Sequence, residues 1–263
     1  MAGARPGTQG AAVRVTISAR HERVNRKRRF GCTAVVNTAW MSERRSWVYR
    51  HGLLLANAAL FVLFFVGMVL TGLQTYNGDQ VAHGEAAVSL LGYLGTGDFV
   101  EATFENWESE FLQMAMYVLL TVYLFQQGSS ESKPIGEHPP QDDDPRHGTA
   151  ASDEPWPVRR GGWVLAVYEN SLLLLFGVLF LASVALHAAG GASAYSAEQQ
   201  AHGQPGVSVL GYVGTLQFWF ESFQNWQSEF LAVAVLVGGS VYLRQRGSPE
   251  SKPVSAPHAA TGA

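Results

Sequence analysis

The sequence predicts an all-α integral membrane protein with four transmembrane helices, arranged as two tandem helical hairpins in the same orientation. Three observations predict this class: long apolar segments, an internal repeat, and the confinement of Lys and Arg to stretches outside the hairpins. The overall composition would also suit a soluble protein, because the mean hydropathy is +0.04 and the net charge is −3. The fold class therefore follows from how the residues are distributed along the chain.

Four apolar segments match the length of about 20 residues that a helix needs to cross a bilayer. They lie at about 52–73, 111–125, 171–189 and 230–243. The second and fourth are shorter, but each continues upstream through an amphipathic stretch. A soluble all-α core is the alternative, yet soluble helices need a charged face, and these segments have none. We expect helices at about 50–74, 98–127, 163–189 and 217–246.

The chain repeats itself at an offset of 119 residues. Residues 48–134 align without a gap with residues 167–253, and about 40 of the 87 pairs are identical. The repeat predicts a first membrane hairpin over 46–127 and a second over 163–246. Because each hairpin crosses the membrane twice, the two are parallel repeats about an axis along the membrane normal.

Basic residues predict the orientation, because Lys and Arg near helix ends are retained on the cytoplasmic side. No Lys or Arg lies between Arg50 and Lys133, or between Arg160 and Arg244. We therefore expect both termini and the central linker to be cytoplasmic, and the two loops within the hairpins to face outward from the inner (plasma) membrane.

Three segments lie outside the hairpins. Residues 1–45 are basic and are predicted to be a disordered extension, and Met41 reads as a natural start. This basic arm would suit anionic lipid headgroups or nucleic acid, although we expect no nucleic-acid partner. Residues 128–162 predict a flexible linker and 247–263 a disordered tail. The one cysteine, Cys32, excludes an intrachain disulfide.

Two motifs in each repeat carry a resemblance to a known family. Asn-Trp-x-Ser-Glu-Phe-Leu begins at Asn106 and again at Asn225, and Gly-Ser-x-Glu-Ser-Lys-Pro begins at Gly128 and again at Gly247. In these motifs the chain resembles the bacterial membrane proteins catalogued as domain of unknown function 6766, over about 46–252. The resemblance leaves out the residues before Met41 and the linker, and it implies no particular activity.

A polar stripe runs along the predicted helix at 98–127. At 100° per residue one line collects Thr103, Asn106, Glu110, Gln113, Tyr117 and Thr121. Glu101, Glu105 and Glu108 form another face, as expected for an amphipathic section at the membrane surface. In the second repeat Asn225 and Glu229 keep the outer half of the stripe, and Trp107 and Trp226 are predicted interface anchors.

Glu110 and Glu229 are costly in lipid, so they should face the bundle interior, water or a partner. The simpler interpretation is that Asn and Glu hydrogen-bond across helices and hold the hairpins together. The alternative is that both carboxylates meet near the axis between the repeats and share a proton or a cation. Neither interpretation is excluded by the sequence.

His83 and His202 lie beside Gly in the outward loops, where two His and two Glu would offer ligands for zinc. Their spacing matches no metal motif, so no metal site and no cofactor are predicted. His187, Asn57 and Gln74 have no counterpart in the other repeat and are interpreted as packing or interface residues.

The sequence contains no phosphate-binding loop after a strand, no Gly-x-Ser-x-Gly elbow and no Cys-x-x-Cys, so we predict no enzymatic activity. The favoured function is a structural, stress-related or partner-binding module in the lipid bilayer, compatible with a homo-oligomer. The alternative is an ion- or proton-linked transporter or channel that uses Glu110 and Glu229.

Overall fold

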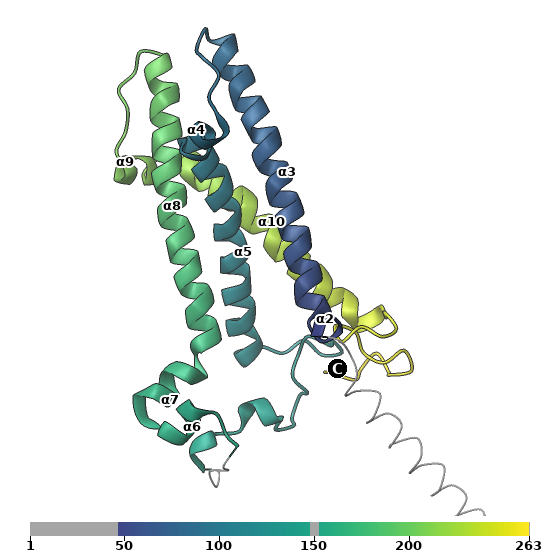
Figure 1. Ribbon diagram of the computed structural model, residues 1–263. Helices are drawn as coiled ribbons and strands as arrows, with labels where there is room; N and C mark the ends of the chain where they lie inside the picture. Colours follow the sequence, from purple (N-terminus) through teal and green to yellow (C-terminus); the bar gives the residue numbers. More distant parts are fainter. Residues whose placement is uncertain (1–46, 148–152, 263) are drawn as a thin grey trace, which may run out of the picture. The chain divides into compact units, whose positions relative to one another are not determined.

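The computed structural model describes residues 47–147 and 153–262, so Met41, Cys32 and the rest of the basic extension lie outside the described residues. Every regular element among these residues is helical (Figure 1). The elements are α2 (Trp47–Arg50), α3 (Gly52–Ala82), α4 (Leu90–Leu94), α5 (Gly97–Tyr123), η1 (Pro140–Asp142), η2 (Pro145–His147), α6 (Trp156–Arg160), α7 (Gly162–Glu169), α8 (Ser171–Ala201), α9 (Val209–Val213) and α10 (Leu216–Tyr242). The predicted all-α class is confirmed.

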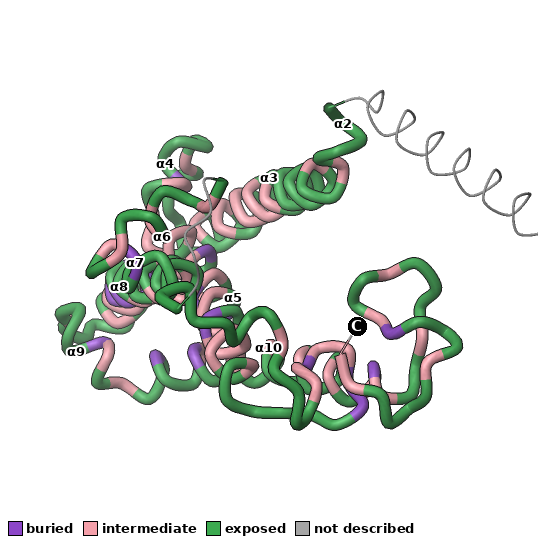
Figure 2. Tube along the Cα trace, turned by 90° about the horizontal axis from the view of Figure 1, so that it is seen from below, coloured by how far each residue is buried: buried purple, intermediate pink, exposed green. Residues whose placement is uncertain are grey.

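Two of the described helices, α3 and α8, are long and apolar enough to cross a membrane by length and composition. Each has 31 residues, and their most apolar windows have mean hydropathies of 2.6 and 2.4. No residue of α3 is buried, and its exposed apolar side chains include Leu53, Leu54 and Phe64. Figure 2 shows only exposed and intermediate positions along α3. A helix that is apolar on all sides needs lipid or another apolar surface around it.

The long helices differ at their ends from the ranges predicted by hydropathy. α3 and α8 run on to Ala82 and Ala201, past the apolar segments, because helical hydrogen bonding continues until the His-Gly turns. Gly84 and Gly203 accept the positive φ values of those turns. The predicted third helix is interrupted at Asn170, whose side-chain amide donates to the carbonyl of Ala166.

Short capped helices precede α5 and α10. The hydroxyl of Ser89 accepts from Gly92 N at the start of α4, and Ser208 accepts from Gly211 N at the start of α9. Thr96 and Thr215 cap α5 and α10 in the same way. Ser and Thr at these aligned positions satisfy amides that the first helical turn leaves free. The caps therefore set where α5 and α10 begin.

The described residues fall into two compact units, 47–68 and 69–262. In the second unit α8 packs along α5, and α10 contacts both α5 and α9. The α5–α8 contact is made close by glycine. A Cβ atom added at Gly190 would lie 2.6 Å from the backbone nitrogen of Glu101, and one added at Gly97 would lie 2.7 Å from the Gly190 carbonyl oxygen. Small residues let two helix backbones approach in this way.

The described parts of the linker and of the C-terminal segment contain defined turns. The linker holds η1, η2 and α6, and Lys133 Nζ lies 2.7 Å from the Asp142 carboxylate. In the C-terminal segment Lys252 is buried, and its ammonium donates to the carbonyl oxygens of Pro257, His258 and Ala260. The tail is therefore organised around one lysine, which the Pro- and Ser-rich composition did not indicate.

Candidate functional site

A pair of buried ionisable side chains lies at the contact between α5 and α8. Glu108 of α5 and His187 of α8 are both fully buried, and His187 Nδ1 lies 2.8 Å from a Glu108 carboxylate oxygen. The other carboxylate oxygen accepts a hydrogen bond of 2.9 Å from Trp226 Nε1 on α10. The His187 ring also stacks on Phe218, with ring centroids 4.9 Å apart. Three helices therefore fix the position of this pair.

The second ring nitrogen of His187 points toward another carboxylate. His187 Nε2 lies 3.4 Å from a Glu221 carboxylate oxygen. An imidazole that donates from Nδ1 to Glu108 carries a lone pair on Nε2 when it is neutral. Two acceptors then face each other, and a positive species between them, either a proton or a metal ion, removes that conflict.

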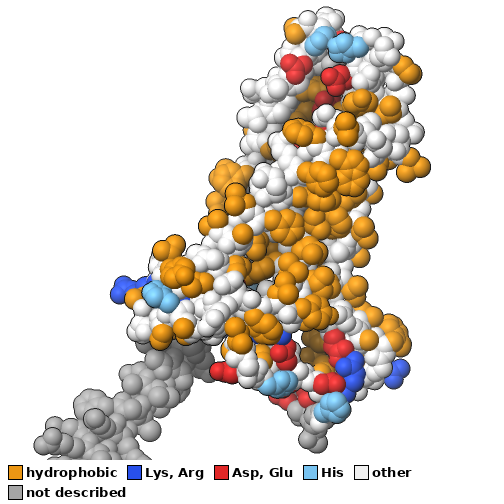
Figure 3. All heavy atoms as spheres, turned by 180° about the vertical axis from the view of Figure 1, so that it is seen from behind, with side chains coloured by type: hydrophobic (Ala, Val, Ile, Leu, Met, Phe, Trp, Pro, Cys, Tyr) orange, Lys and Arg blue, Asp and Glu red, His pale blue; other side chains and the backbone are white. Residues whose placement is uncertain are grey.

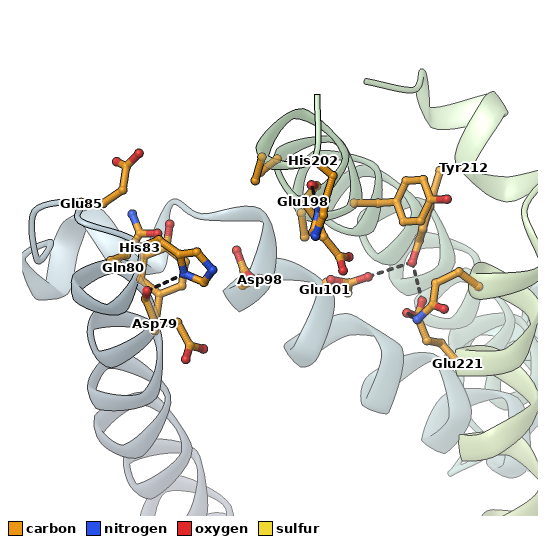
Figure 4. A pocket seen from close by; sticks show the side chains of 16 residues that line it. Asp79, Gln80, His83, Glu85, Asp98, Glu101, Glu198, His202, Tyr212 and Glu221 are labelled. Atoms are coloured by element: carbon orange, nitrogen blue, oxygen red, sulfur yellow. Dashed lines mark hydrogen bonds between the residues drawn. The ribbon is translucent and has the colours of Figure 1, made fainter. Parts of the chain in front are cut away.

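Tyr212 links Glu221 to a further carboxylate. Its hydroxyl donates to a Glu101 oxygen at 2.8 Å and also contacts Glu221 (Figure 4). The ring is fully buried and fills the space above Gly191, where an added Cβ atom would lie 2.6 Å from the ring carbon that bears the hydroxyl. Burial and the two carboxylates raise the pKa of Tyr212, so the phenol stays protonated as a donor.

These contacts form one continuous chain of polar groups, which we call the acid-histidine chain. Its members are Glu101, Tyr212, Glu221, His187 and Glu108. A buried charge is tolerated only when it is paired and hydrogen-bonded, and each member here has such a partner. The acid-histidine chain therefore joins four helices, α5, α8, α9 and α10.

The acid-histidine chain opens into a polar pocket of about 890 Å³ at the ends of α3 and α8. Among the described residues, its walls carry six carboxylates, two histidines and no Lys or Arg. The carboxylates belong to Asp79, Glu85, Asp98, Glu101, Glu198 and Glu221. Figure 3 shows acidic and histidine side chains gathered at the tip drawn uppermost. The field in such a pocket attracts cations.

Two residues of this wall, together with the buried His187, have the chemistry of metal ligands. One ligand atom each from Glu101, His187 and Glu221 lies within 4.8 Å of the other two. The set contains one imidazole and two carboxylates, which suits divalent transition metals. Among the described residues, these three side chains bring possible metal ligands together. The sequence analysis predicted no metal site at these positions.

The predicted polar stripe does not form one connected cluster. The amides of Asn106 and Asn225 donate to carbonyls of their own helices, Ala102 O and Glu221 O. The amide of Gln113 donates to the backbone carbonyl of Glu229 at 3.1 Å and so joins α5 to α10. The bond from Gln113 therefore crosses between two helices, whereas the two asparagine bonds stay within one helix each.

Glu110 is exposed, and Glu229 is partly buried. Tyr117 donates to the Glu131 carboxylate at 2.7 Å, at the opposite end of α5 from the pocket. The role predicted for Glu110 and Glu229, sharing a proton or cation at the axis, stays a prediction.

The two predicted loop histidines line the pocket mouth but lie outside the metal-ligand group. His83 Nδ1 and His202 Nδ1 each lie within hydrogen-bond distance of a backbone carbonyl oxygen, of Asp79 at 2.8 Å and of Glu198 at 2.9 Å. Both histidines are exposed. Of the predicted interface anchors, Trp226 is a hydrogen-bond donor to Glu108, and Trp107 packs against the rings of Phe104 and Phe111.

Sequence reasoning missed the central residues of the site. His187 was interpreted as a packing residue, and Glu108 was placed on an outward acidic face. One signal was available in the repeat: His187, Glu221 and Glu108 align with Met68, Ala102 and Gln227. Ionisable residues that occur in one copy and not in the other indicate a feature made once per chain.

The chain was compared with protein families, curated proteins and solved structures. The family described as Domain of unknown function (DUF6766) matches residues 44–263. The match agrees with the resemblance drawn from the two motifs, and it also runs through the linker at 128–162, which that resemblance left out. No curated protein and no solved structure matches the chain. The chain belongs to the DUF6766 family.

Proposed function

We propose that this protein is a multi-pass bacterial inner-membrane protein, without enzymatic activity, that binds cations in the acidic pocket at the ends of α3 and α8. The observation that carries the proposal is the acid-histidine chain, which leads from the pocket to the buried carboxylate of Glu108. Sequence analysis favoured a structural, stress-related or partner-binding module, and the proposal specifies that its ligand is a cation.

In the proposed architecture α3, α5, α8 and α10 are four spans in two parallel hairpins, with both termini cytoplasmic. Aligned helices have equal lengths, 31 residues for α3 and α8 and 27 for α5 and α10. At about 1.5 Å per residue, even the shorter pair is about 40 Å long and exceeds the hydrocarbon thickness of about 30 Å. The aligned Ser and Thr caps support the same repeat.

The charge distribution supports a cation as the ligand. In the part of the chain that the structure describes, the pocket walls bear carboxylates without any Lys or Arg to neutralise them. A helix contact made only for stability would be served as well by apolar side chains, because buried ion pairs often add little net stability. Glu108, His187 and Glu221 are more readily explained as a binding device than as helix glue.

A second candidate is cation or proton permeation, and one observation favours it. Polar side chains continue along α5 beyond the pocket, through Gln113 to Tyr117, whose hydroxyl reaches Glu131 near the Gly-Ser-Ser-Glu-Ser-Lys-Pro turn. Flux across sealed vesicles separates the two candidates, because binding alone produces none.

The test of the proposed function is equilibrium dialysis of the purified full chain in detergent against Ca²⁺, Mn²⁺ and Zn²⁺. We expect at least one of them to bind, and the variant Asp98→Asn/Glu198→Gln, which neutralises two carboxylates at the pocket mouth, to bind about 3- to 10-fold more weakly. Asp153→Asn, at an exposed linker position, is the control. Absence of binding by all three ions would refute the function.

A further inference from the structure

We infer that Glu101, His187 and Glu221 coordinate one divalent transition-metal ion of the zinc class, with Glu108 and Trp226 orienting the histidine. The inference rests on the proposed cation-binding function and names the ion and its ligands. It concerns a site within the second structural unit, where all five residues lie.

The geometry of the three ligand atoms is close to that of a metal site. They lie within 4.8 Å of one another. Ligands at about 2.0–2.1 Å from a tetrahedral zinc ion are about 3.4 Å apart. Side-chain rotations in Glu101 and Glu221, which are only partly buried, bring their oxygens inward by the remaining distance. His187 is held by its packing and does not need to move.

The partners of His187 are those of a metal-bound histidine. Metal-ligating imidazoles usually donate their other ring N–H to a carboxylate, which fixes the tautomer and turns a lone pair toward the metal. Here His187 Nδ1 faces Glu108 at 2.8 Å, and Trp226 Nε1 holds the far oxygen of that carboxylate at 2.9 Å. The lone pair on Nε2 then points at Glu221, on the side of the pocket.

The ligand types select the class of ion. Ca²⁺ and Mg²⁺ prefer sites made only of oxygen, so an imidazole ligand disfavours them. Thiolate ligands, which favour Cu(I), are missing from the set, whereas Zn²⁺, Mn²⁺ and Fe²⁺ accept one imidazole and two carboxylates. Three protein ligands leave one coordination position toward the pocket, through which the ion enters and water or a further ligand binds.

The internal repeat predicts the stoichiometry. The first copy has Met68 and Ala102 where the second has His187 and Glu221. A second site of this kind is therefore not expected at the aligned positions, and the chain should bind one ion tightly. The aligned residues also supply the replacements His187→Met and Glu221→Ala, whose side chains occur at the same positions of the other copy.

The experiment is a titration of the chelator-stripped full chain in detergent with Zn²⁺, and with Co²⁺ as a spectroscopic probe. We expect one Zn²⁺ per chain and visible Co²⁺ bands of a four-coordinate site. His187→Met and Glu221→Ala should each weaken Zn²⁺ binding by about 100-fold or more, and Glu108→Gln by about 10- to 100-fold. His138→Ala, at an exposed position of the linker outside the pocket, should leave the affinity unchanged.

Several results would overturn the assignment. One is Zn²⁺ affinity that is equal in the parent chain and in both ligand variants, and another is affinity lost in His138→Ala instead. If His187→Met does not fold, Glu221→Ala and the Co²⁺ spectrum decide. Binding of Ca²⁺ that depends on Asp98 and Glu198 but not on His187 would retain the pocket function and remove the metal assignment. Absence of any bound cation would remove both.

Discussion

Gly190→Ala should separate α8 from α5 and strongly destabilise the protein. The added methyl group would lie 2.6 Å from the Glu101 backbone nitrogen and 3.0 Å from the Gly97 carbonyl oxygen. Backbone atoms cannot rotate away as a side chain can, so the helices must separate. Overpacking of this kind costs about 1–3 kcal/mol, and the separation would also pull His187 away from Glu108.

The measurement is thermal or denaturant unfolding of the purified chain in detergent, followed by size-exclusion chromatography. Gly177→Ala is the matched control, because it lies on the same helix and an added Cβ there has nothing within 4 Å. We expect Gly177→Ala to unfold like the parent chain. Equal stability of the two variants would show that α8 does not approach α5 closely at Gly190.

Removal of both partners of the Glu108–His187 pair should cost less stability than the sum of the two single removals. Glu108→Leu leaves the His187 and Trp226 donors without an acceptor, and His187→Met leaves a buried carboxylate without its imidazole. Breaking one side of a buried pair costs about 3–5 kcal/mol. In the double variant no isolated charge remains, so the loss should be smaller than the sum of the two single losses.

A double-mutant cycle in chelator-free buffer without added metal measures this coupling. Gln227→Leu is the matched control for Glu108→Leu, because position 227 is aligned with position 108 in the repeat and is exposed. The control should change the free energy of unfolding little. Strictly additive losses for the pair would contradict a direct contact between Glu108 and His187.

The all-helical fold class and much of the local structure could be predicted from the sequence. Ser89 and Ser208, and Thr96 and Thr215, are aligned residues of the types that begin helices, and each caps a helix. Caps depend on neighbours a few residues away, so a sequence pattern contains the necessary information.

The sequence pattern does not show which helices pack against each other. Periodicity places Glu108 on a face of α5 but does not say which helix covers that face. The cover is α8, admitted by Gly97 and Gly190, and it converts an apparently outward acidic residue into a buried one. His187 was recognised as polar within an apolar helix, but its role required knowledge of the three helices around it. The predicted Glu110 and Glu229 pair was inferred from symmetry, whereas the acid-histidine chain uses residues that break the symmetry.

The account depends on the pocket lying at the outer face of a membrane that the chain crosses in two parallel hairpins. Ala82 and Ala201 are exposed, aligned residues that end α3 and α8, and Ser255 is exposed in the C-terminal segment. In a Cys32→Ala background, a membrane-impermeant maleimide applied to intact cells should label Ala82→Cys and Ala201→Cys, and should label Ser255→Cys only after permeabilisation. Labelling of only one of the two helix ends, or of Ser255→Cys in intact cells, would contradict the account.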